Sequence, residues 1–345
     1  MKLKIYSALA LVGILLTSCS MSGGSSSNGQ VDVPYSSTTS QVDRPVESSS
    51  SNNEPTPTSS SSTSKPSTSS SSSTSKPSTS SSSSSSSTSK PNSNPSHDGE
   101  SQEITNYYAN VNTSSADALY TSLKSLTSGS KSHSYKDLWT TYKEVYVRDD
   151  GKIFDYYSNI TNYTPGSGQC GSYSGEGSCY NREHSIPKSW WGGSESNQGA
   201  DPFIVVPTDG WVNSVRSNYP FGNVKTVSKS SKNNFCVLGS SDGTGGYNGT
   251  VFEPDDSVKG DFARIYFYAA TKYNAGSWSK SEGSVCFSSS GKYNLTSYSV
   301  TLFKQWNELD PVSEWELSVN EGIYDIFGIR NPYINRPEYI DIIWK

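Results

Sequence analysis

Residues 179–191, CYNREHSIPKSWW, contain the residue types that hydrolysis at neutral pH requires. His184 is one of three histidines, and the other two, His97 and His133, lie in a serine-rich segment and at a predicted helix junction. A neutral imidazole, with an ordinary pKa near ~6.5, can take a proton from water at physiological pH. His184 is therefore the candidate general base. The alternative is a histidine that only packs on Trp190.

The carboxylate of Glu183 directly precedes this histidine and is a candidate metal ligand. Mg²⁺ prefers oxygen ligands and retains most of its waters, so one carboxylate and one amide oxygen satisfy it. Neighbouring side chains of a strand point to opposite faces, so Glu183 and His184 can share a site only if the strand twists or the metal lies at its edge. The alternative for Glu183 is a surface ion pair with Arg182 or Lys188.

A predicted helix at residues 208–218, TDGWVNSVRSN with Thr208 as its N-cap, supplies further polar groups. Asn213 and Arg216 are three residues apart and so lie on one helix face. Asparagine weakens a helix interior, so Asn213 is either a cap-like structural residue or a ligand. Arg216 either pairs with Asp209 or stabilises charge on a phosphate oxygen.

The N-terminal segments do not contribute to this site. Residues 1–18 have a basic start and an apolar stretch too short to span a bilayer, which is typical of a signal peptide. The sequence LTSC ending at Cys19 resembles a bacterial lipobox, which implies cleavage before Cys19 and a lipid anchor to the membrane; the alternative is an ordinary cleaved signal peptide. Residues 19–103 are rich in serine, threonine and proline and are expected to form a disordered tether.

Residues 104–345 are long enough for one large domain and contain all eight tryptophans. The formal net charge of the chain, −5, argues against a high-affinity, non-catalytic nucleic-acid binder, which carries excess positive charge. The expected helices and short strands do not alternate as βαβ units, and this pattern predicts an α+β fold. We also expect the protein to be a monomer. We expect helices at residues 115–129, 134–146, 259–274, 312–328 and 336–344, and strands at 151–159 and 201–207.

Four cysteines remain when Cys19 is assigned to the lipid. An even number outside the membrane suggests disulfides. Cys170 and Cys179 bracket a glycine-rich loop and form the natural local pair. This pairing leaves Cys236 to pair with Cys286.

Four segments of the domain resemble, in order and spacing, those of the endonuclease I family. They are CGSYSGEGSCYNREHSIPKSWWGG, PTDGWVNSVRSNYPFGNV, VFEPDDSVKGDFARIYFYAATKY and WNELDPVSEWELSVNEGIYDIFGIRNPYI, between about residues 140 and 340. Members are secreted or periplasmic bacterial nucleases of the ββα-metal (His-Me finger) class. They are sugar-non-specific, which means that they accept nucleic acids with ribose or deoxyribose. The resemblance implies an extracellular enzyme that cuts DNA, and RNA as well, without sequence specificity. With the lipobox at Cys19, we expect this enzyme to be anchored by a lipid to the extracellular face of the membrane.

The resemblance also implies residue roles. His184 would activate water, while Glu183 and Asn213 would hold one Mg²⁺, for which Mn²⁺ or Ca²⁺ could substitute. The metal would contact a non-bridging phosphate oxygen and the 3′ leaving oxygen, leaving a 5′-phosphate. Arg216 would neutralise phosphate charge, and Asn218 would help to bind the substrate.

The sequence departs from the family pattern at four positions. Phe203 and Ile204 stand where histidine is frequent, and Phe327 and Ile329 replace an amide pair. Loss of polar groups around a metal site commonly costs 10–100-fold in activity or metal affinity. The alternative function is therefore a catalytically weak or silent surface protein that uses a nuclease fold as an adhesin or binding module.

Overall fold

The computed structural model describes residues 100–195 and 197–345, so the expected signal peptide, Cys19 and most of the expected tether lie outside the described residues. The first helix, α1 (Gln102–Tyr108), begins just before the domain boundary expected at residue 104. Ser101 caps this helix through Ile104 N, and Glu100 forms an ion pair with Arg336 close to the C-terminus. The folded part of the chain therefore includes residue 100.

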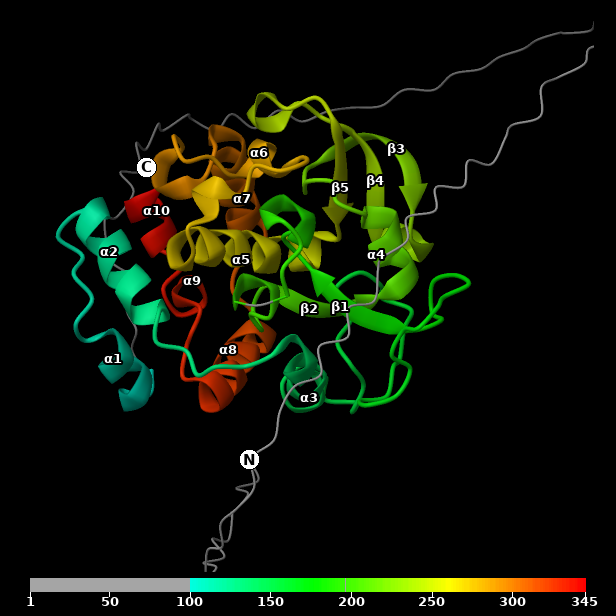
Figure 1. Ribbon diagram of the computed structural model, residues 1–345, viewed down its shortest axis with the longest axis horizontal. Helices are drawn as coiled ribbons and strands as arrows, with labels where there is room; N and C mark the ends of the chain where they lie inside the picture. Colours follow the sequence, from blue (N-terminus) through cyan, green and yellow to red (C-terminus); the bar gives the residue numbers. More distant parts are fainter. Residues whose placement is uncertain (1–99, 196) are drawn as a thin grey trace, which may run out of the picture. The chain divides into compact units, whose positions relative to one another are not determined.

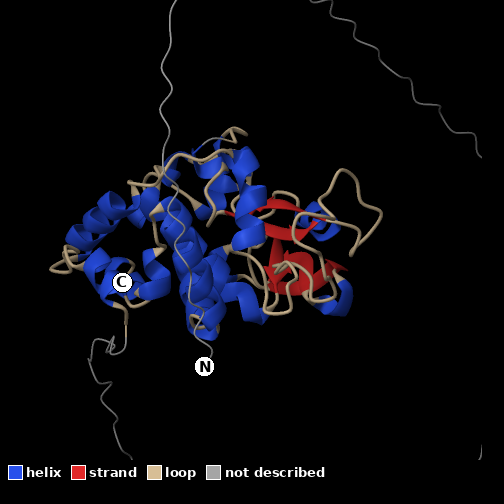
Figure 2. Cartoon of the chain, turned by 90° about the horizontal axis from the view of Figure 1, so that it is seen from below, coloured by secondary structure: helices blue, strands red, loops and turns tan. Residues whose placement is uncertain are grey.

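The described residues form helices and two antiparallel sheets, an α+β fold (Figure 1). Figure 2 shows the strands gathered on one side and most of the helices on the other. Beyond α1, the helices are α2 (Ala116–Thr127), α3 (Leu138–Glu144), α4 (Gly210–Arg216), α5 (Lys259–Lys272), α6 (Gly283–Cys286), α7 (Ser297–Leu309), α8 (Glu314–Phe327), α9 (Pro332–Asn335) and α10 (Tyr339–Ile343). The strands are β1 (Tyr180–His184), β2 (Val205–Asp209), β3 (Val224–Ser230), β4 (Cys236–Ser241) and β5 (Thr250–Pro254).

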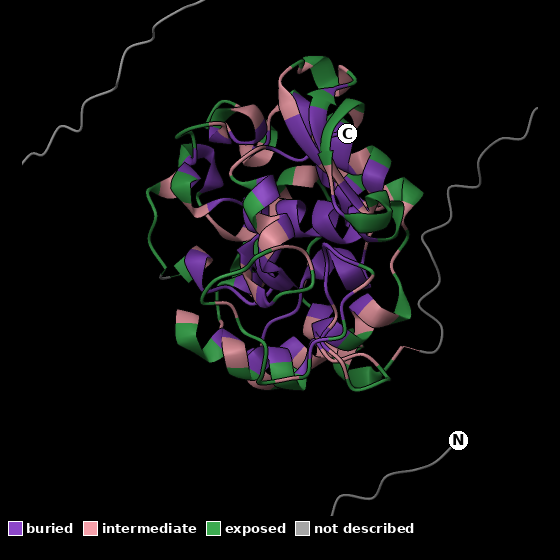
Figure 3. Cartoon of the chain, turned by 90° about the vertical axis from the view of Figure 1, so that its right-hand side faces the viewer, coloured by how far each residue is buried: buried purple, intermediate pink, exposed green. Residues whose placement is uncertain are grey.

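Helix α5 runs through the core. Every one of its residues except Lys272 is buried, and it packs against α7, α2 and α9. A helix that is buried all round belongs to the interior of a domain and not to its surface. Figure 3 shows this buried centre inside an exposed outer layer. None of the helices in residues 100–195 and 197–345 combines the length and apolar composition needed to cross a bilayer.

Strands β1 and β2 form a two-stranded antiparallel sheet, in which Glu183 lies opposite Val206 and His184 opposite Val205. A separate sheet has the strand order β3-β4-β5. Helix α4 follows β2 without a loop, so two paired strands lead directly into a helix.

Asp209 makes this sharp transition from β2 to α4 possible. Its Oδ1 accepts the backbone N–H groups of Trp211 and Val212, both at 2.9 Å, which caps the helix. Its own N–H donates to the buried Asp155, whose second oxygen accepts a hydrogen bond from Thr161. A network of buried acids therefore fixes where α4 begins.

The helices predicted at 115–129, 134–146, 259–274, 312–328 and 336–344 are confirmed within a few residues by α2, α3, α5, α8 and α10. The strand predicted at 151–159 is wrong, since only an isolated bridge joins Val147 and Ile153. The strand predicted at 201–207 begins only at Val205, because Asp201 accepts a hydrogen bond from Phe203 N and turns the chain.

Two further corrections concern a helix cap and the cysteines. Asp209, and not Thr208, caps α4, because the Asp209 carboxylate accepts the first helix N–H groups while the Thr208 hydroxyl donates to Asn181. Cys170 and Cys179 form the expected disulfide. Cys236 and Cys286 are free, buried thiols, so the second expected disulfide is wrong. Cys236 lies in β4 between β3 and β5, whereas Cys286 ends α6 against α7, so different elements hold the two thiols.

Candidate active site

One surface pocket of about 280 Å³ contains all of the predicted catalytic, metal-binding and substrate-binding residues. Strand β1 contributes Glu183 and His184, and α4 and the residues after it contribute the others. The pocket is lined by Tyr135, Arg182, Glu183, His184, Pro187, Lys188, Ser189, Asn213, Arg216, Ser217 and Asn218. The structure thus brings together two segments that are about thirty residues apart in the sequence.

Glu183 and His184 reach the same pocket from opposite faces of β1. The Glu183 carboxylate lies on the side of Tyr157 and Arg216, whereas the His184 ring lies on the side of Tyr135. Strand β1 pairs with β2, and a bridge to Gln169 covers its other edge at Tyr180. At the opposite end of β1, the His184 carbonyl accepts a hydrogen bond from Arg216 in α4. The pocket therefore lies at the edge of the strand beside α4, which resolves the geometric difficulty of two adjacent site residues.

The carboxylate of Glu183 is buried and held by two donors. Its Oε1 accepts hydrogen bonds from the Tyr157 hydroxyl at 2.9 Å and from Arg216 at 2.7 Å. Burial raises the pKa of Glu183 to about 7, and the charge of Arg216 opposes that rise. The side-chain amide of Asn213 also hydrogen-bonds the carboxylate and, like Arg216, opposes the rise of its pKa.

Arg216 is fully buried and ties α4 to β1. Its Nη1 donates to Glu183 and to the His184 carbonyl, and its Nη2 donates to the Ser185 carbonyl at 2.6 Å. It forms no ion pair with Asp209, whose oxygens are taken by helix N–H groups and other donors. Because only 1% of its side chain is exposed, the geometry favours a role in orienting Glu183 over direct contact with a phosphate.

The imidazole of His184 is held in a single orientation. Its Nε2 lies 3.0 Å from the carbonyl oxygen of Gly199, and its ring stacks on Tyr135 at 5.4 Å. A carbonyl only accepts, so Nε2 carries the proton and Nδ1 is left as an acceptor. Burial lowers the pKa of His184 to about 4, and the Gly199 carbonyl opposes this shift. The ring is therefore neutral at neutral pH and able to accept a proton at Nδ1.

Asn213 projects from α4 into the pocket. Its Nδ2 donates to Asn181 Oδ1 at 2.9 Å, and that same oxygen accepts from Thr208. Asn213 also hydrogen-bonds the Glu183 carboxylate, so the two side chains are neighbours. Asn181 lies on the same face of β1 as Glu183 and holds the amide of Asn213 between the strand and the helix.

The oxygen atoms that the pocket offers as metal ligands suit a hard divalent cation that binds few protein groups. A carboxylate and an amide, Glu183 and Asn213, adjoin each other and offer oxygen atoms of the kind that Mg²⁺ prefers. Residues 100–195 and 197–345 contain no group of three or more His, Cys, Asp or Glu side chains arranged to hold a metal ion. A metal at this site would therefore retain most of its waters.

At the rim of the pocket, Asn218 donates to Glu282 at 3.1 Å and Lys188 pairs with Glu195 at 2.7 Å. Sequence reasoning missed Tyr135, Tyr157 and Gly199, which contact the site from distant segments and carry no local motif. It considered Arg182 only as an ion-pair partner of Glu183, although the residue lines the pocket.

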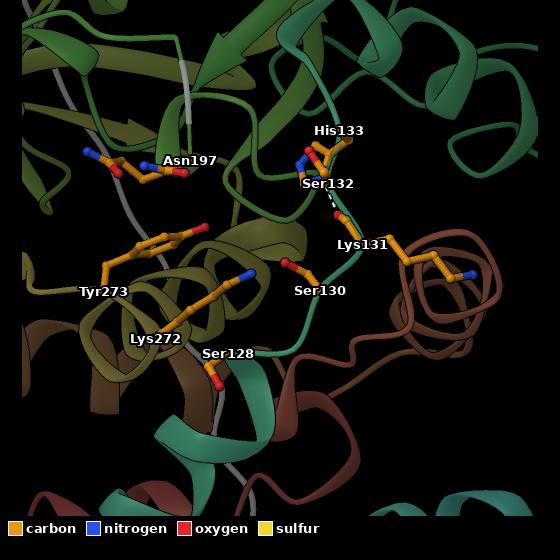
Figure 4. A pocket seen from close by; sticks show the side chains of 9 residues that line it. Ser128, Ser130, Lys131, Ser132, His133, Asn197, Lys272 and Tyr273 are labelled. Atoms are coloured by element: carbon orange, nitrogen blue, oxygen red, sulfur yellow. Dashed lines mark hydrogen bonds between the residues drawn. The ribbon is translucent and has the colours of Figure 1, made fainter.

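The loop that carries Gly199 also borders a second, larger pocket of about 460 Å³. Figure 4 shows Asn197, Lys272 and Tyr273 directed into it. Lys272 and Tyr273 donate to the buried Asp201, which follows Gly199 closely in the chain. These bonds anchor the loop on α5 and so fix the carbonyl that holds His184.

The four positions that depart from the expected pattern do not line the site pocket. Phe203, Ile204, Phe327 and Ile329 all belong to the buried core. Phe203 packs against Tyr268 of α5, with ring centres 5.0 Å apart. Their apolar side chains therefore belong to the packed interior and not to the site pocket.

The sequence model of the Endonuclease I family matches residues 115–338. An extracellular ribonuclease of Bacillus amyloliquefaciens is 32% identical over 247 residues, 71% of this chain and 80% of that protein. An extracellular ribonuclease of Bacillus subtilis is 32% identical and covers 69% of this chain and 78% of its own. Endonuclease-1 of Buchnera aphidicola subsp. Acyrthosiphon pisum is 25% identical, over 41% of this chain and 46% of its own.

Proposed function

The chain belongs to the endonuclease I family and is a nuclease, and on this premise we propose that it hydrolyses phosphodiester bonds of DNA and RNA in the pocket between β1 and α4. The observation that carries the proposal is the neutral, oriented imidazole of His184 next to the oxygen ligands of Glu183 and Asn213. These groups suit a ββα-metal nuclease, in which a strand carries the base and the following helix carries an amide ligand.

In the proposed reaction, Nδ1 of His184 takes a proton from a water molecule while the oxygen of that water attacks the phosphorus atom. The bond between phosphorus and O3′ breaks, so the products are a 5′-phosphate and a 3′-hydroxyl. The leaving O3′ takes a proton from solvent, and the imidazolium returns its proton to solvent. The Gly199 carbonyl keeps the ring in the tautomer that this step needs.

Glu183 and Asn213 would hold one Mg²⁺, with Mn²⁺ or Ca²⁺ as possible substitutes. A divalent cation at this place supplies charge stabilisation for the phosphate and the leaving oxygen. Arg216 keeps the Glu183 carboxylate oriented toward the pocket, and Asn218 contributes to the substrate-binding rim.

The proposed substrates follow from the relatives and from the pocket. Two relatives are named ribonucleases and a third is named an endonuclease, so we propose both RNA and DNA as substrates. The pocket groups recognise phosphate and water and do not read a base, which supports cleavage without sequence specificity.

Cleavage of plasmid DNA and of a structured RNA by the purified full chain tests this function. With Mg²⁺ both substrates should be degraded, and EDTA or the change His184→Ala should reduce the rate at least 10²-fold. Inactivity of the wild-type chain with Mg²⁺, Mn²⁺ and Ca²⁺ across pH 5–9 would favour the alternative of a silent binding module. Wild-type rates in His184→Ala would refute the role of the base.

Two of the relatives are named extracellular ribonucleases, and we propose that this chain acts outside the cell, anchored by a lipid on Cys19. The change Cys19→Ser should move the nuclease from the membrane fraction to the medium. Equal membrane retention of both forms would refute the lipid anchor without affecting the proposed chemistry.

A further inference from the structure

Arg182 presents a guanidinium to the proposed active site from the strand that carries the base. The residue lines the same pocket as Glu183 and His184. Its guanidinium carbon lies 3.6 Å from the centre of the Tyr135 ring and 4.5 Å from that of Trp139. Two aromatic faces therefore hold the planar group in place, as arginine stacking on aromatic rings commonly does.

The hydrogen-bonding capacity of Arg182 is largely unused among the residues that the structure describes. Its Nη1 donates to the Tyr135 carbonyl at 2.8 Å, whereas a guanidinium has five N–H donors. Within residues 100–195 and 197–345, Arg182 forms no ion pair with a carboxylate. The remaining donors can therefore bind an anionic ligand.

The other two cations of the pocket are already neutralised. Arg216 is buried against Glu183 at 2.7 Å. Lys188 pairs with Glu195, also at 2.7 Å. Among the described residues that line the pocket, Arg182 is thus the cation best able to meet a phosphate without first giving up a carboxylate.

We propose that Arg182 binds a phosphate of the nucleic-acid substrate next to the phosphate that is cleaved, an inference that rests on the function proposed above. Arg182 and His184 are two residues apart on one face of β1, a separation of roughly 6.6 Å. The reacting phosphate has to lie against His184 and Glu183, so the guanidinium of Arg182 faces the next position along the nucleic-acid strand.

The aromatic support explains why an arginine suits this place. A guanidinium donates two parallel N–H bonds to one phosphate, and stacking fixes the plane of that fork before the substrate arrives. Lysine would supply the positive charge, but it has neither the two parallel N–H donors nor a planar group that stacks on the aromatic rings. We therefore expect Arg182→Lys to restore only part of what Arg182→Gln loses.

Activity on two substrates distinguishes binding of a neighbouring phosphate by Arg182 from a general effect of the substitution on the active site. A long duplex DNA has neighbouring phosphates, whereas bis(4-nitrophenyl) phosphate has a single phosphodiester and no neighbour. Arg182→Gln should lower kcat/KM on the duplex about 10–100-fold, consistent with the loss of charged hydrogen bonds. On the small diester it should stay within about 2-fold of wild type. Lys229→Gln, which removes an exposed charge of β3 outside the pocket, is the matched control and should affect the duplex only weakly.

Binding supplies a second readout that does not depend on turnover. In a His184→Ala background, the slope of log K against log salt concentration for duplex DNA should fall by about 0.9 with Arg182→Gln. An unchanged slope, or equal losses on both substrates, would overturn the inference. If the wild-type chain does not cleave DNA, the proposed function fails, and the salt slope still tests whether Arg182 meets a phosphate.

Discussion

At the scale of single residues, the site depends on one buried arginine that joins its two halves. Arg216 of α4 binds the carboxylate of Glu183 and two carbonyls at the end of β1. Without that cation, Glu183 would be a buried carboxylate whose remaining donors are neutral. The arginine thus stabilises the negative charge of Glu183, the proposed metal ligand, in a position where burial disfavours that charge.

The change Arg216→Met should lower the free energy of unfolding by about 3–5 kcal/mol, because it leaves an uncompensated buried charge. The double change Arg216→Met/Glu183→Gln should recover part of that loss, since no charge is then stranded. Urea denaturation of both variants measures the difference. Equal destabilisation of the single and double variants would show that the carbonyl contacts of Arg216 matter more than its pairing with Glu183.

At the scale of elements, the loop between β1 and β2 orients His184, the proposed base. Gly199 presents its carbonyl to His184, and Asp201 anchors the loop through Tyr268, Lys272 and Tyr273 of the α5 region. The orientation of His184, the proposed base, therefore depends on a helix that does not itself line the site pocket.

The change Gly199→Ala should reduce activity strongly, by roughly 10–100-fold, as loss of a group that orients a site residue does. A Cβ atom there would lie 2.3 Å from the Ser194 carbonyl oxygen, so the loop has to move and carry the Gly199 carbonyl with it. The rate of plasmid cleavage measures this effect. Gly129→Ala, where a Cβ meets nothing within 4 Å, is the control and should be fully active.

The disulfide holds a second element of the site. Cys170 lies against Gly210 at the start of α4, and Gly210 N donates to the Cys179 carbonyl. Replacing both cysteines by alanine should lower the free energy of unfolding by about 2–3 kcal/mol, through the entropy of the opened loop, and should loosen the helix that carries Asn213. Chemical denaturation and nuclease assays measure the two effects.

Alkylation of the cysteines checks directly which of them form the disulfide. Alkylation of the denatured, non-reduced chain should modify Cys236 and Cys286 and leave Cys170 and Cys179 unmodified. Recovery of a peptide that links Cys236 to Cys286 would contradict the structure. The sequence alone favoured that link only because two cysteines were left over.

Sequence patterns predicted the elements of the site better than the contacts that orient them. Local signals were sufficient for α4 and for the shared helix face of Asn213 and Arg216. The Gly199 carbonyl and the Tyr157 hydroxyl were not predictable, because they reach the site through the tertiary fold. The three-stranded sheet and α7 were also missed, since neither was recognised in the hydrophobic pattern.

At the scale of the whole molecule, buried acids link the site to global stability. Asp155 is buried beside Asp209, and its oxygens accept hydrogen bonds from Tyr157, Thr161 and the Asp209 backbone. Burial raises the pKa of Asp155 to about 7, and the neighbouring Asp209 adds to the rise. The pKa of the Asp155 carboxyl is therefore higher in the folded domain than in the unfolded chain.

This arrangement predicts how stability changes with pH. The unfolded carboxyl has a pKa near ~3.9, so the contribution of Asp155 is fully present below about pH 4 and is lost as the pH rises through 7. The change Asp155→Asn removes this titration and retains the acceptor oxygen. The stability of wild type relative to Asp155→Asn should therefore fall between pH 4 and 7, by at most about 1.4 kcal/mol per pH unit. Chemical denaturation at several pH values measures the difference, with the exposed Asp149→Asn as control. A difference that does not vary with pH would show that Asp155 is ionised in the folded domain throughout this range.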